Sequence, residues 1–168
     1  MRRICIILSC IFVLGILSGC GKRAAKLNID TAPKIVVLTI DNKPRNLEEG
    51  IANEYDRVIT WMNRDIIKVL KNSGFEATLI KSKKEYRSAN GKLLVMNVSK
   101  LDVGNRGMRI FVGFGAGAAS LDIDYKLYKN GKKLHQWTDG VGSSRGGTYC
   151  AQTLNRNVAN KLVTYFNK

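Results

Sequence analysis

The sequence predicts an α+β fold, with two helices packed on one face of a mixed, mostly antiparallel sheet of about five strands. Apolar or alternating runs of strand length recur along the chain. Two longer segments carry apolar residues at three- and four-residue spacing, which is typical of amphipathic helices. The elements follow the order strand, helix, strand, several strands and helix, as expected for a sheet with its helices on one side.

The first half of the chain predicts one long helix between two strands. Residues 34–40 are a β-branched run, which is typical of a strand buried on both faces. From about residue 47 to 72 the spacing becomes helical, and Gly74 follows as a typical helix-ending residue. Residues 75–80 predict the second strand. The apolar stripe of the helix is Ile51, Tyr55, Val58, Ile59, Met62, Ile66, Val69 and Leu70.

The second half predicts antiparallel strands and a terminal helix. Residues 93–103 alternate, and a change of phase near Ser99 indicates a bulge. Residues 121–128 alternate strictly between apolar and polar side chains, as in a strand with one buried face. Asn130-Gly131 predicts a two-residue type I′ hairpin turn. From about Thr148 a helical stripe returns with Ala151, Leu154, Val158, Leu162 and Tyr165.

The hairpin turn also predicts a register. Regular pairing from the turn places Lys126 opposite His135, on the polar face of the hairpin. The carboxylates that would share this face are Asp122, Asp124 and Asp139. Together they could hold a weak cation, but a solvated surface balanced by lysines is the simpler interpretation.

Length and composition indicate one ordinary globular domain without an internal repeat. The hydrophobic fraction is 45% of 168 residues, and 28 basic residues face 13 acidic ones. A strong positive field favours phosphate groups, nucleic acid or anionic membrane surfaces as partners. Because the lysines are dispersed along the chain, the simpler interpretation is that they keep the surface soluble.

The N-terminal stretch has the layout of a secretory signal. Arg2 and Arg3 precede an apolar run from residue 4 to 17, which is too short to span a bilayer as a permanent helix. The run closes with Leu17-Ser18-Gly19-Cys20, an ending that resembles the signal of bacterial lipoproteins. The resemblance implies cleavage before Cys20 and attachment of palmitate-type lipid to that residue. An ordinary signal peptide with a chance cysteine is the alternative.

The lipoprotein resemblance implies an organisation and a place. Residues 1–19 would be the signal peptide, residues 20–32 a lipidated tether, and residues 33–168 a single α+β envelope domain. In lipoprotein families, Gly21 after the cysteine implies the outer membrane, with the domain facing the periplasm. The bilayer is then a partner through acylated Cys20, and no nucleic acid is expected there.

Few residues remain that could bind a metal or act as nucleophiles. Once the signal is removed, Cys150 is the only cysteine besides Cys20, and His135 is the only histidine. This inventory excludes zinc sites built on several Cys or His ligands. Cys150 lies at the start of the last predicted helix, so a pair with His135 is conceivable, but a lone buried thiol is the simpler interpretation. We predict no catalytic residue, no metal and no cofactor.

A glycine-rich segment, Phe111-Val112-Gly113-Phe114-Gly115-Ala116-Gly117, precedes the alternating strand. Its glycines formally match a dinucleotide fingerprint, but that fingerprint requires a helix directly afterwards. The segment and the hairpin that follows it resemble an uncharacterised family of bacterial lipoproteins, described only as a domain of unknown function. The element order is also similar, more weakly, to TolB amino-terminal and curli-secretion envelope domains. The residues expected to allow a close backbone approach or to meet a partner are Phe111, Gly113, Phe114, Gly115 and Gly117.

A second flexible loop precedes the terminal helix. It consists of Gly142, Ser143, Ser144, Arg145, Gly146, Gly147 and Thr148. Backbone N–H groups at a helix start, two hydroxyls and an arginine could together cradle an anion. The loop is not a P-loop, because no Gly-Lys-Ser/Thr ends it, and a mobile connector is the simpler interpretation.

Two functions of different class follow. The first is a non-enzymatic envelope lipoprotein that scaffolds or assists assembly or transport, either as a homo-oligomer or with an envelope protein partner. The second is a periplasmic binding protein for an anionic ligand or polymer, using the 142–148 loop and the basic surface. An enzyme is disfavoured, since no convergent acid–base set is evident.

Overall fold

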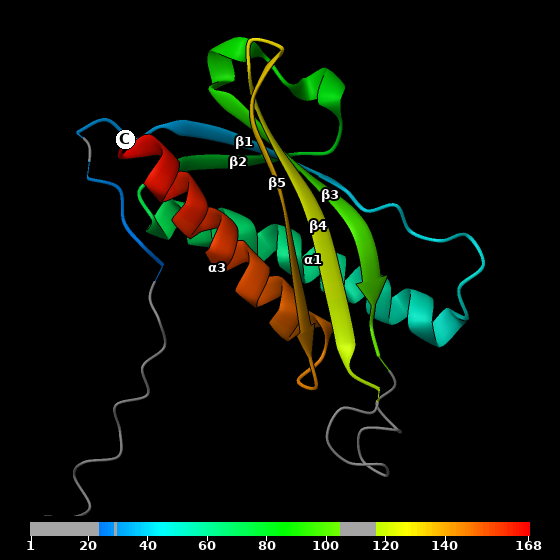
Figure 1. Ribbon diagram of the computed structural model, residues 1–168. Helices are drawn as coiled ribbons and strands as arrows, with labels where there is room; N and C mark the ends of the chain where they lie inside the picture. Colours follow the sequence, from blue (N-terminus) through cyan, green and yellow to red (C-terminus); the bar gives the residue numbers. More distant parts are fainter. Residues whose placement is uncertain (1–23, 29, 105–116) are drawn as a thin grey trace, which may run out of the picture.

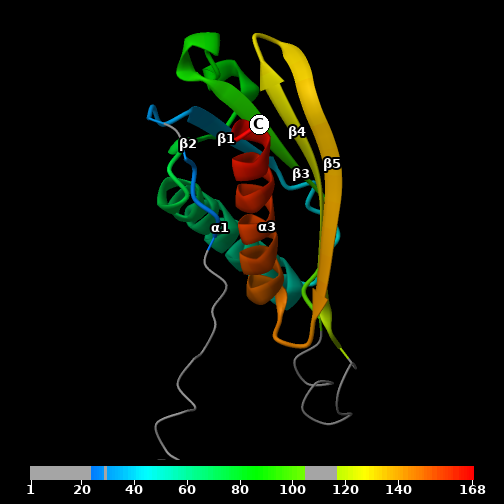
Figure 2. The same ribbon diagram turned by 60° about the vertical axis from the view of Figure 1, so that its left-hand side comes forward.

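Five strands form one mixed sheet, and two long helices cover one of its faces (Figures 1 and 2). The computed structural model describes residues 24–28, 30–104 and 117–168. This arrangement confirms the predicted α+β class. The elements are β1 (Lys34–Ile40), α1 (Glu49–Asn72), β2 (Glu76–Ile80), the 3₁₀ turns η1 (Lys83–Glu85) and η2 (Ser88–Asn90), β3 (Lys92–Asp102), β4 (Ala119–Lys129), β5 (Lys132–Ser143) and α3 (Gly147–Phe166).

The strand β1 lies inside the sheet, whose order is β2-β1-β3-β4-β5. It is parallel to both neighbours, while β3, β4 and β5 pair in longer antiparallel ladders. Ile35 and Val37 face the helices in the main core. Val36 and Leu38 belong to a smaller cluster on the other face, which Tyr86 from the connection between β2 and β3 helps to cover. The prediction of a strand buried on both faces is therefore confirmed.

The predicted stripes of both helices are largely buried. In α1 the buried members are Tyr55, Val58, Ile59, Met62, Ile66 and Leu70. Ile51, in the first turn of α1, is instead 42% exposed, beside Val103 and Gly104 at the end of β3. Ile67, which the helical spacing leaves unexplained, is half-buried at the margin of the main core.

A buried amide joins the two helices. Asn155 of α3 is fully buried, and its Nδ2 donates to the Met62 carbonyl and to Asp65 Oδ2, each at 3.0 Å. Gly147, the first residue of α3, packs so closely on α1 that a Cβ there would lie 2.9 Å from Val58 Cγ2. These contacts hold α3 against α1 and thereby fix the helical layer.

The hairpin between β4 and β5 begins as predicted but changes register after two pairs. Both turn residues, Asn130 and Gly131, have positive φ, as a type I′ turn requires. Tyr128 pairs with Lys133, as regular pairing from the turn requires, but Leu127 then pairs with His135. Leu134 is an extra residue in the ladder, so it forms a bulge.

This bulge corrects the predicted faces of β5, since a shift of one residue moves every later side chain to the opposite face. Tyr125 pairs with Trp137, and His135 and Asp139 lie on the helix-covered face. Asp122 and Asp124 stay on the other face, so the predicted grouping of these carboxylates with His135 is wrong. The bulge predicted near Ser99 in β3 is confirmed by a register shift between Val98 and Lys100.

Residues 24–28, within the predicted tether, lie along the helices. The backbone N–H of Ala25 donates to Asn160 Oδ1 at 2.8 Å, and that of Leu27 donates to the Ser73 carbonyl at 2.9 Å. The Leu27 side chain packs at the edge of the main core. This segment, blue in Figure 2, is thus joined to the folded structure on the side of the helices.

The buried amide of Asn155 gives a stability prediction. We expect Asn155→Ala to lower the free energy of unfolding by about 1–3 kcal/mol, because it removes two buried hydrogen bonds and leaves Asp65 without this donor. Asn157→Ala, on the exposed side of the same helix, removes one exposed hydrogen bond to Asp139 and should cost less than about 1 kcal/mol. Urea unfolding of the two variants measures the difference. Equal losses would contradict a structural role for the buried amide.

Candidate interaction surfaces

The predicted lipidation residue and most of the glycine-rich segment lie outside the described residues. They are Cys20, Phe111, Gly113, Phe114 and Gly115. Gly117, the last of the segment, is described, and it has a φ of +66°. A Cβ on Gly104 would lie 2.3 Å from the Gly117 carbonyl oxygen. The chain entering the segment therefore runs against the chain leaving it, and only a glycine fits at position 104.

The predicted anion-binding loop, residues 142–148, joins the end of β5 to the start of α3. Ser143 Oγ accepts the Arg145 backbone N–H at 3.0 Å. The Arg145 guanidinium lies 4.1 Å from the centre of the Tyr149 ring, so it stacks on the first turn of α3. These contacts give the loop a structural role, and anion binding by it stays a prediction.

Cys150 and His135 lie at opposite ends of α3. The Cys150 thiol is buried and donates to the Ala119 carbonyl at 3.6 Å, near the start of the helix. The His135 ring stacks on Tyr165, in the last turn, with ring centres 5.9 Å apart. Fifteen helical residues separate the two ends, or about 22 Å. A Cys–His pair is therefore excluded, and the lone buried thiol is the interpretation that the structure confirms.

A row of rings follows β5 beneath the C-terminal half of α3. Tyr125 stacks on Trp137 at 5.0 Å between ring centres, and Trp137 contacts His135 at 5.3 Å. The half-buried Trp137 also lies beneath Lys161, whose Nζ is 5.4 Å from the ring centre. The Tyr125 hydroxyl is fully buried and has no hydrogen-bond partner among the described residues. Burial, with the charge of Asp139 adding to it, raises the pKa of this hydroxyl.

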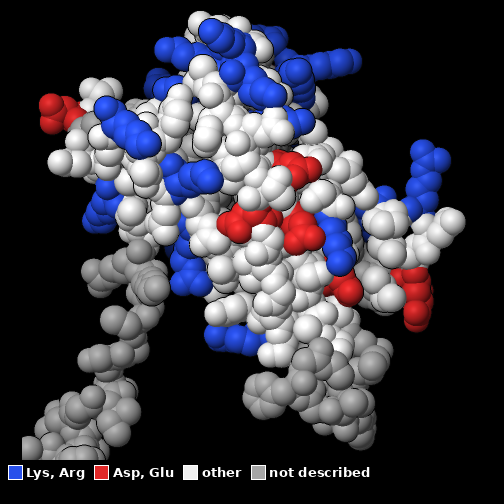
Figure 3. Space-filling model, in the orientation of Figure 1, with Lys and Arg blue, Asp and Glu red and all other residues white. Residues whose placement is uncertain are grey.

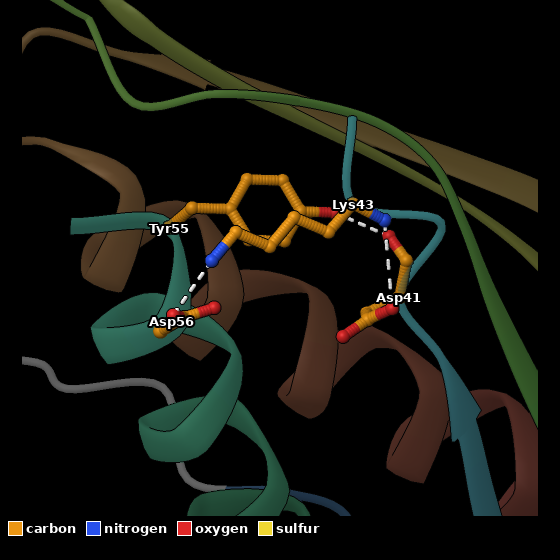
Figure 4. A network of polar contacts seen from close by, with 4 residues as sticks. All are labelled: Asp41, Lys43, Tyr55 and Asp56. Carbon is orange, nitrogen blue, oxygen red and sulfur yellow. Dashed lines mark hydrogen bonds and ion pairs between the residues drawn. The ribbon is translucent and has the colours of Figure 1, made fainter. Parts of the chain in front are cut away.

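A polar network holds the chain where it leaves β1 (Figure 4). The Tyr55 hydroxyl donates to the Asp41 carbonyl, and Lys43 Nζ pairs with Asp56 Oδ2 at 2.7 Å. Burial, then the charges of Asp41 and Asp56, raise the pKa of Tyr55 to about 12. Nearby, Asn42 reaches the face of the sheet opposite α1 and α3, where its Nδ2 donates to Asn97 Oδ1 at 2.9 Å and to the Val98 carbonyl at 3.0 Å. The network fixes the start of α1 relative to the sheet.

The face of β3, β4 and β5 that no described helix covers, called here the helix-free face, is polar, with its charges separated (Figure 3). Acidic side chains gather over its middle, where Asp122 and Asp124 project from β4. Basic side chains gather at the end with the hairpin turn and the connection between β2 and β3. Lys92, at the same end of the sheet, faces the other way: its Nζ lies 4.1 Å from the centre of the Phe166 ring of α3, and burial, then the charge of Lys129, lower its pKa. The basic residues at this end are Lys81, Lys83, Lys84, Arg87, Lys129, Lys132 and Lys133.

This basic end and the 142–148 loop lie at opposite ends of β5. A strand of twelve residues spans roughly 36 Å between its first and last residue, so one small anion cannot touch both. The two parts of the predicted anion-binding surface are therefore separate surfaces. The sequence already puts the hairpin turn and the loop at the two ends of one strand. Only the structure shows that the connection between β2 and β3 lies at the hairpin end.

No catalytic centre is evident among the described residues. They contain no group of three or more His, Cys, Asp or Glu side chains that could hold a metal ion. Two tyrosines have raised pKa values, but neither lies in a cleft. Tyr55 binds the chain where it leaves β1, and Tyr125 is buried in the core. Within residues 24–28, 30–104 and 117–168, no helix is long and apolar enough to cross a membrane.

Comparison with known families places the chain. The model of a family described as a domain of unknown function, DUF4410, matches residues 36–147. The chain belongs to the DUF4410 family. The match runs from within β1 to the first residue of α3. It therefore includes all five strands and the glycine-rich segment of this DUF4410 protein. No curated protein matches it in sequence.

Several solved structures are similar to this chain. A PelC dodecamer from Paraburkholderia phytofirmans is 16% identical, with a TM-score of 0.55 over 83% of this chain and 93% of that one. Lipoprotein GNA1162 from Neisseria meningitidis is 11% identical, with a TM-score of 0.45 over 79% and 99% of the two chains. A minor lipoprotein from Acinetobacter baumannii is 10% identical, with a TM-score of 0.39 over 79% and 94%. At these identities the likeness to PelC shows a shared fold.

The structure also places residues together that sequence reasoning did not. The ring row depends on the bulge at Leu134, and the Tyr55–Asp41 contact joins a helix to the turn before it. The docking of residues 24–28 had one signal in the sequence, the isolated apolar side chain of Leu27 in a polar segment. No local pattern states which surface such a side chain meets.

The two buried tyrosines give opposite predictions for the same chemical change. Tyr55→Phe should lower the free energy of unfolding by about 1 kcal/mol, since it removes a hydrogen bond. Tyr125→Phe should leave stability unchanged or raise it, because the lost hydroxyl has no partner among the described residues. Thermal and urea unfolding of both variants at neutral pH checks this pair. A large loss for Tyr125→Phe would reveal a partner of that hydroxyl.

The Tyr55 contact also has a pH dependence. Its folded pKa of about 12 lies above the value of about 10 in an unfolded chain. A raised pKa means that the contribution of Tyr55 is fully present below pH 10 or so and is lost as the pH rises toward 12. Between these values Tyr55→Phe should therefore lose less stability than the unaltered protein.

Proposed function

We propose that this protein is a lipid-anchored component of the bacterial envelope that acts by assembling with further copies of itself, and that it is not an enzyme. The observation that carries this proposal is the strand β5. It is twelve residues long, and it lies at the edge of the sheet, where no described strand pairs with its outer side. A free edge offers a row of backbone N–H and C=O groups to another chain.

Only part of this edge is protected. Near the hairpin turn, Lys132, Lys133 and the bulge at Leu134 discourage pairing, as charged side chains and bulges do on natural edge strands. From Gln136 to Gly142 the ladder with β4 is regular. Gly140 and Gly142 leave the backbone exposed in this part. Addition of a strand from another chain is a recognised way to bind such an edge.

The shared fold and the N-terminal sequence support assembly in the envelope. PelC, which shares the fold, forms a dodecamer, so this architecture is compatible with assembly into an oligomer. The N-terminal sequence that ends in Cys20 supports the lipid anchor, with Gly21 favouring the outer membrane and a domain that faces the periplasm. Scaffolding, or assistance to envelope assembly or transport, is the role that this combination favours.

Anchoring is tested through the lipidation residue. Cys20→Ser should abolish acylation, so the protein should remain as uncleaved precursor or become soluble in the periplasm. Fractionation with a high-salt wash, together with the mass of the mature chain, measures this. If the Cys20→Ser variant is cleaved and still remains with the membranes after the high-salt wash, the proposed lipid anchor is wrong. Density fractionation to the inner membrane would overturn the outer-membrane assignment alone.

Assembly is tested at the edge of β5. Thr138→Lys adds a charge at an exposed edge position beside Asp124, where natural edges use lysine to prevent pairing. In detergent-solubilised full-length protein, light scattering should show an oligomer for the unaltered chain and monomers for this variant. Gln152→Lys, an exposed α3 position, adds the same charge and should leave the oligomer intact. A monomeric unaltered protein, or equal association of both variants, would overturn the proposal.

A further inference from the structure

Residues 24–28 run beside the last two turns of α3, in the same direction. The Ala25 N–H donates to Asn160 Oδ1 at 2.8 Å, and the Asn28 N–H donates to Asn167 Oδ1 at 3.3 Å. Three extended residues advance about 10 Å, and seven helical residues advance about 10 Å. The two asparagines, two turns apart on one side of α3, therefore hold the segment at both ends. We call residues 24–28 the strap.

Leu27 fastens the middle of the strap to the other helix. Its N–H donates to the carbonyl of Ser73, the C-cap residue of α1, at 2.9 Å. Its side chain packs at the margin of the main core, and a Cβ on Gly74 would lie 3.3 Å from Leu27 Cβ. The strap thus touches both helices of the layer. It is held by three backbone hydrogen bonds and one apolar contact rather than being a free linker.

The strap leaves little chain between the fold and Cys20. From Cys20 to Ala24 the chain advances by four residues, which span at most about 14 Å when fully extended. The headgroup region of one leaflet takes up roughly 5–8 Å of this length. The remaining reach is comparable to a Debye length of about 8–10 Å. An acyl chain on Cys20 would therefore bring the helical side of the protein to the membrane surface.

The side chains near this exit are basic. Lys26 is exposed on the strap, and Arg156 lies one turn before Asn160 on the same side of α3. Lys71 is exposed in the last turn of α1, close to Ser73. The α3 sequence contains no acidic residue, and the Asp65 carboxylate of α1 is directed toward the buried Asn155 amide. This local charge is complementary to anionic phospholipid headgroups.

We propose that the strap orients the anchored protein, holding the α1–α3 layer against anionic phospholipid headgroups and turning the helix-free face of the sheet away from the bilayer. This inference rests on the lipid anchor proposed above. In Figure 2 the strap and the outer strands β4 and β5 lie on opposite sides of the helices, so a bilayer at the strap leaves β5 accessible. The free edge and the polar face are then presented to the periplasm.

The test measures which side of the lipidated, full-length protein approaches the bilayer. A reporter cysteine is introduced at Gln152, an exposed α3 residue on the same side as Arg156, or at Thr138 on the helix-free face. Each is labelled with a fluorophore, and Cys150 stays protected by burial. The protein is reconstituted in phosphatidylethanolamine–phosphatidylglycerol vesicles that contain a headgroup-linked quencher. Quenching should be stronger at position 152 than at position 138.

Strap variants provide the decisive comparison. Asn160→Ala combined with Asn167→Ala removes both side-chain contacts and should abolish the difference in quenching between the two positions. Asn157→Ala, which affects only the contact with Asp139, should preserve it. Equal quenching at both positions in the unaltered protein, or a difference that survives the double substitution, would overturn the orienting strap. Absence of acylation and of membrane attachment would instead overturn the anchor itself.

Discussion

The burial of β1 on both faces is the constraint on which the rest of the structure depends. A strand whose side chains are apolar on both faces is stabilised fully only when both faces are covered. On one side α1 and α3 cover Ile35 and Val37. On the other side the connection between β2 and β3 contributes Tyr86 over Val36 and Leu38. With β1 inside the sheet, β2 closes one edge and the antiparallel strands extend the other.

This arrangement separates the molecule into sides with different properties. The helical side carries the strap and basic residues, including Lys26 and Arg156. The helix-free side of β3, β4 and β5 is polar, with carboxylates over its middle and lysines at the hairpin end. The outer edge of β5 is free of described strands. A chain held to a membrane by its helical side would offer every copy the same free edge in the same orientation, as closed symmetric assemblies require.

One residue decides much of the surface chemistry. The bulge at Leu134 moves His135 and Trp137 beneath α3, where they extend the core with a row of stacked rings. Without it they would stand on the helix-free face beside Asp124. The bulge therefore partly buries Trp137 and His135 and leaves the helix-free face polar. It also makes the part of the β5 edge nearest the turn irregular.

The sequence by itself determined the elements and their class. The β-branched run of β1, the stripe from Tyr55 to Leu70 and the Asn130-Gly131 turn are local patterns, because each follows from backbone preference and the spacing of apolar side chains. The resemblance carried by the glycine-rich segment likewise pointed to a family of unknown function.

Only the tertiary structure decided the strand order, the register of β5 beyond Lys133, the separation of Cys150 from His135 and the docking of residues 24–28. These features depend on contacts between residues far apart in the chain. The bulge forms because the packing of Trp137 and His135 against α3 lowers the free energy more than regular pairing would. Leu27 docks because the end of α1 and the side of α3 lie next to each other at that point. Neither balance of free energies is contained in the local sequence.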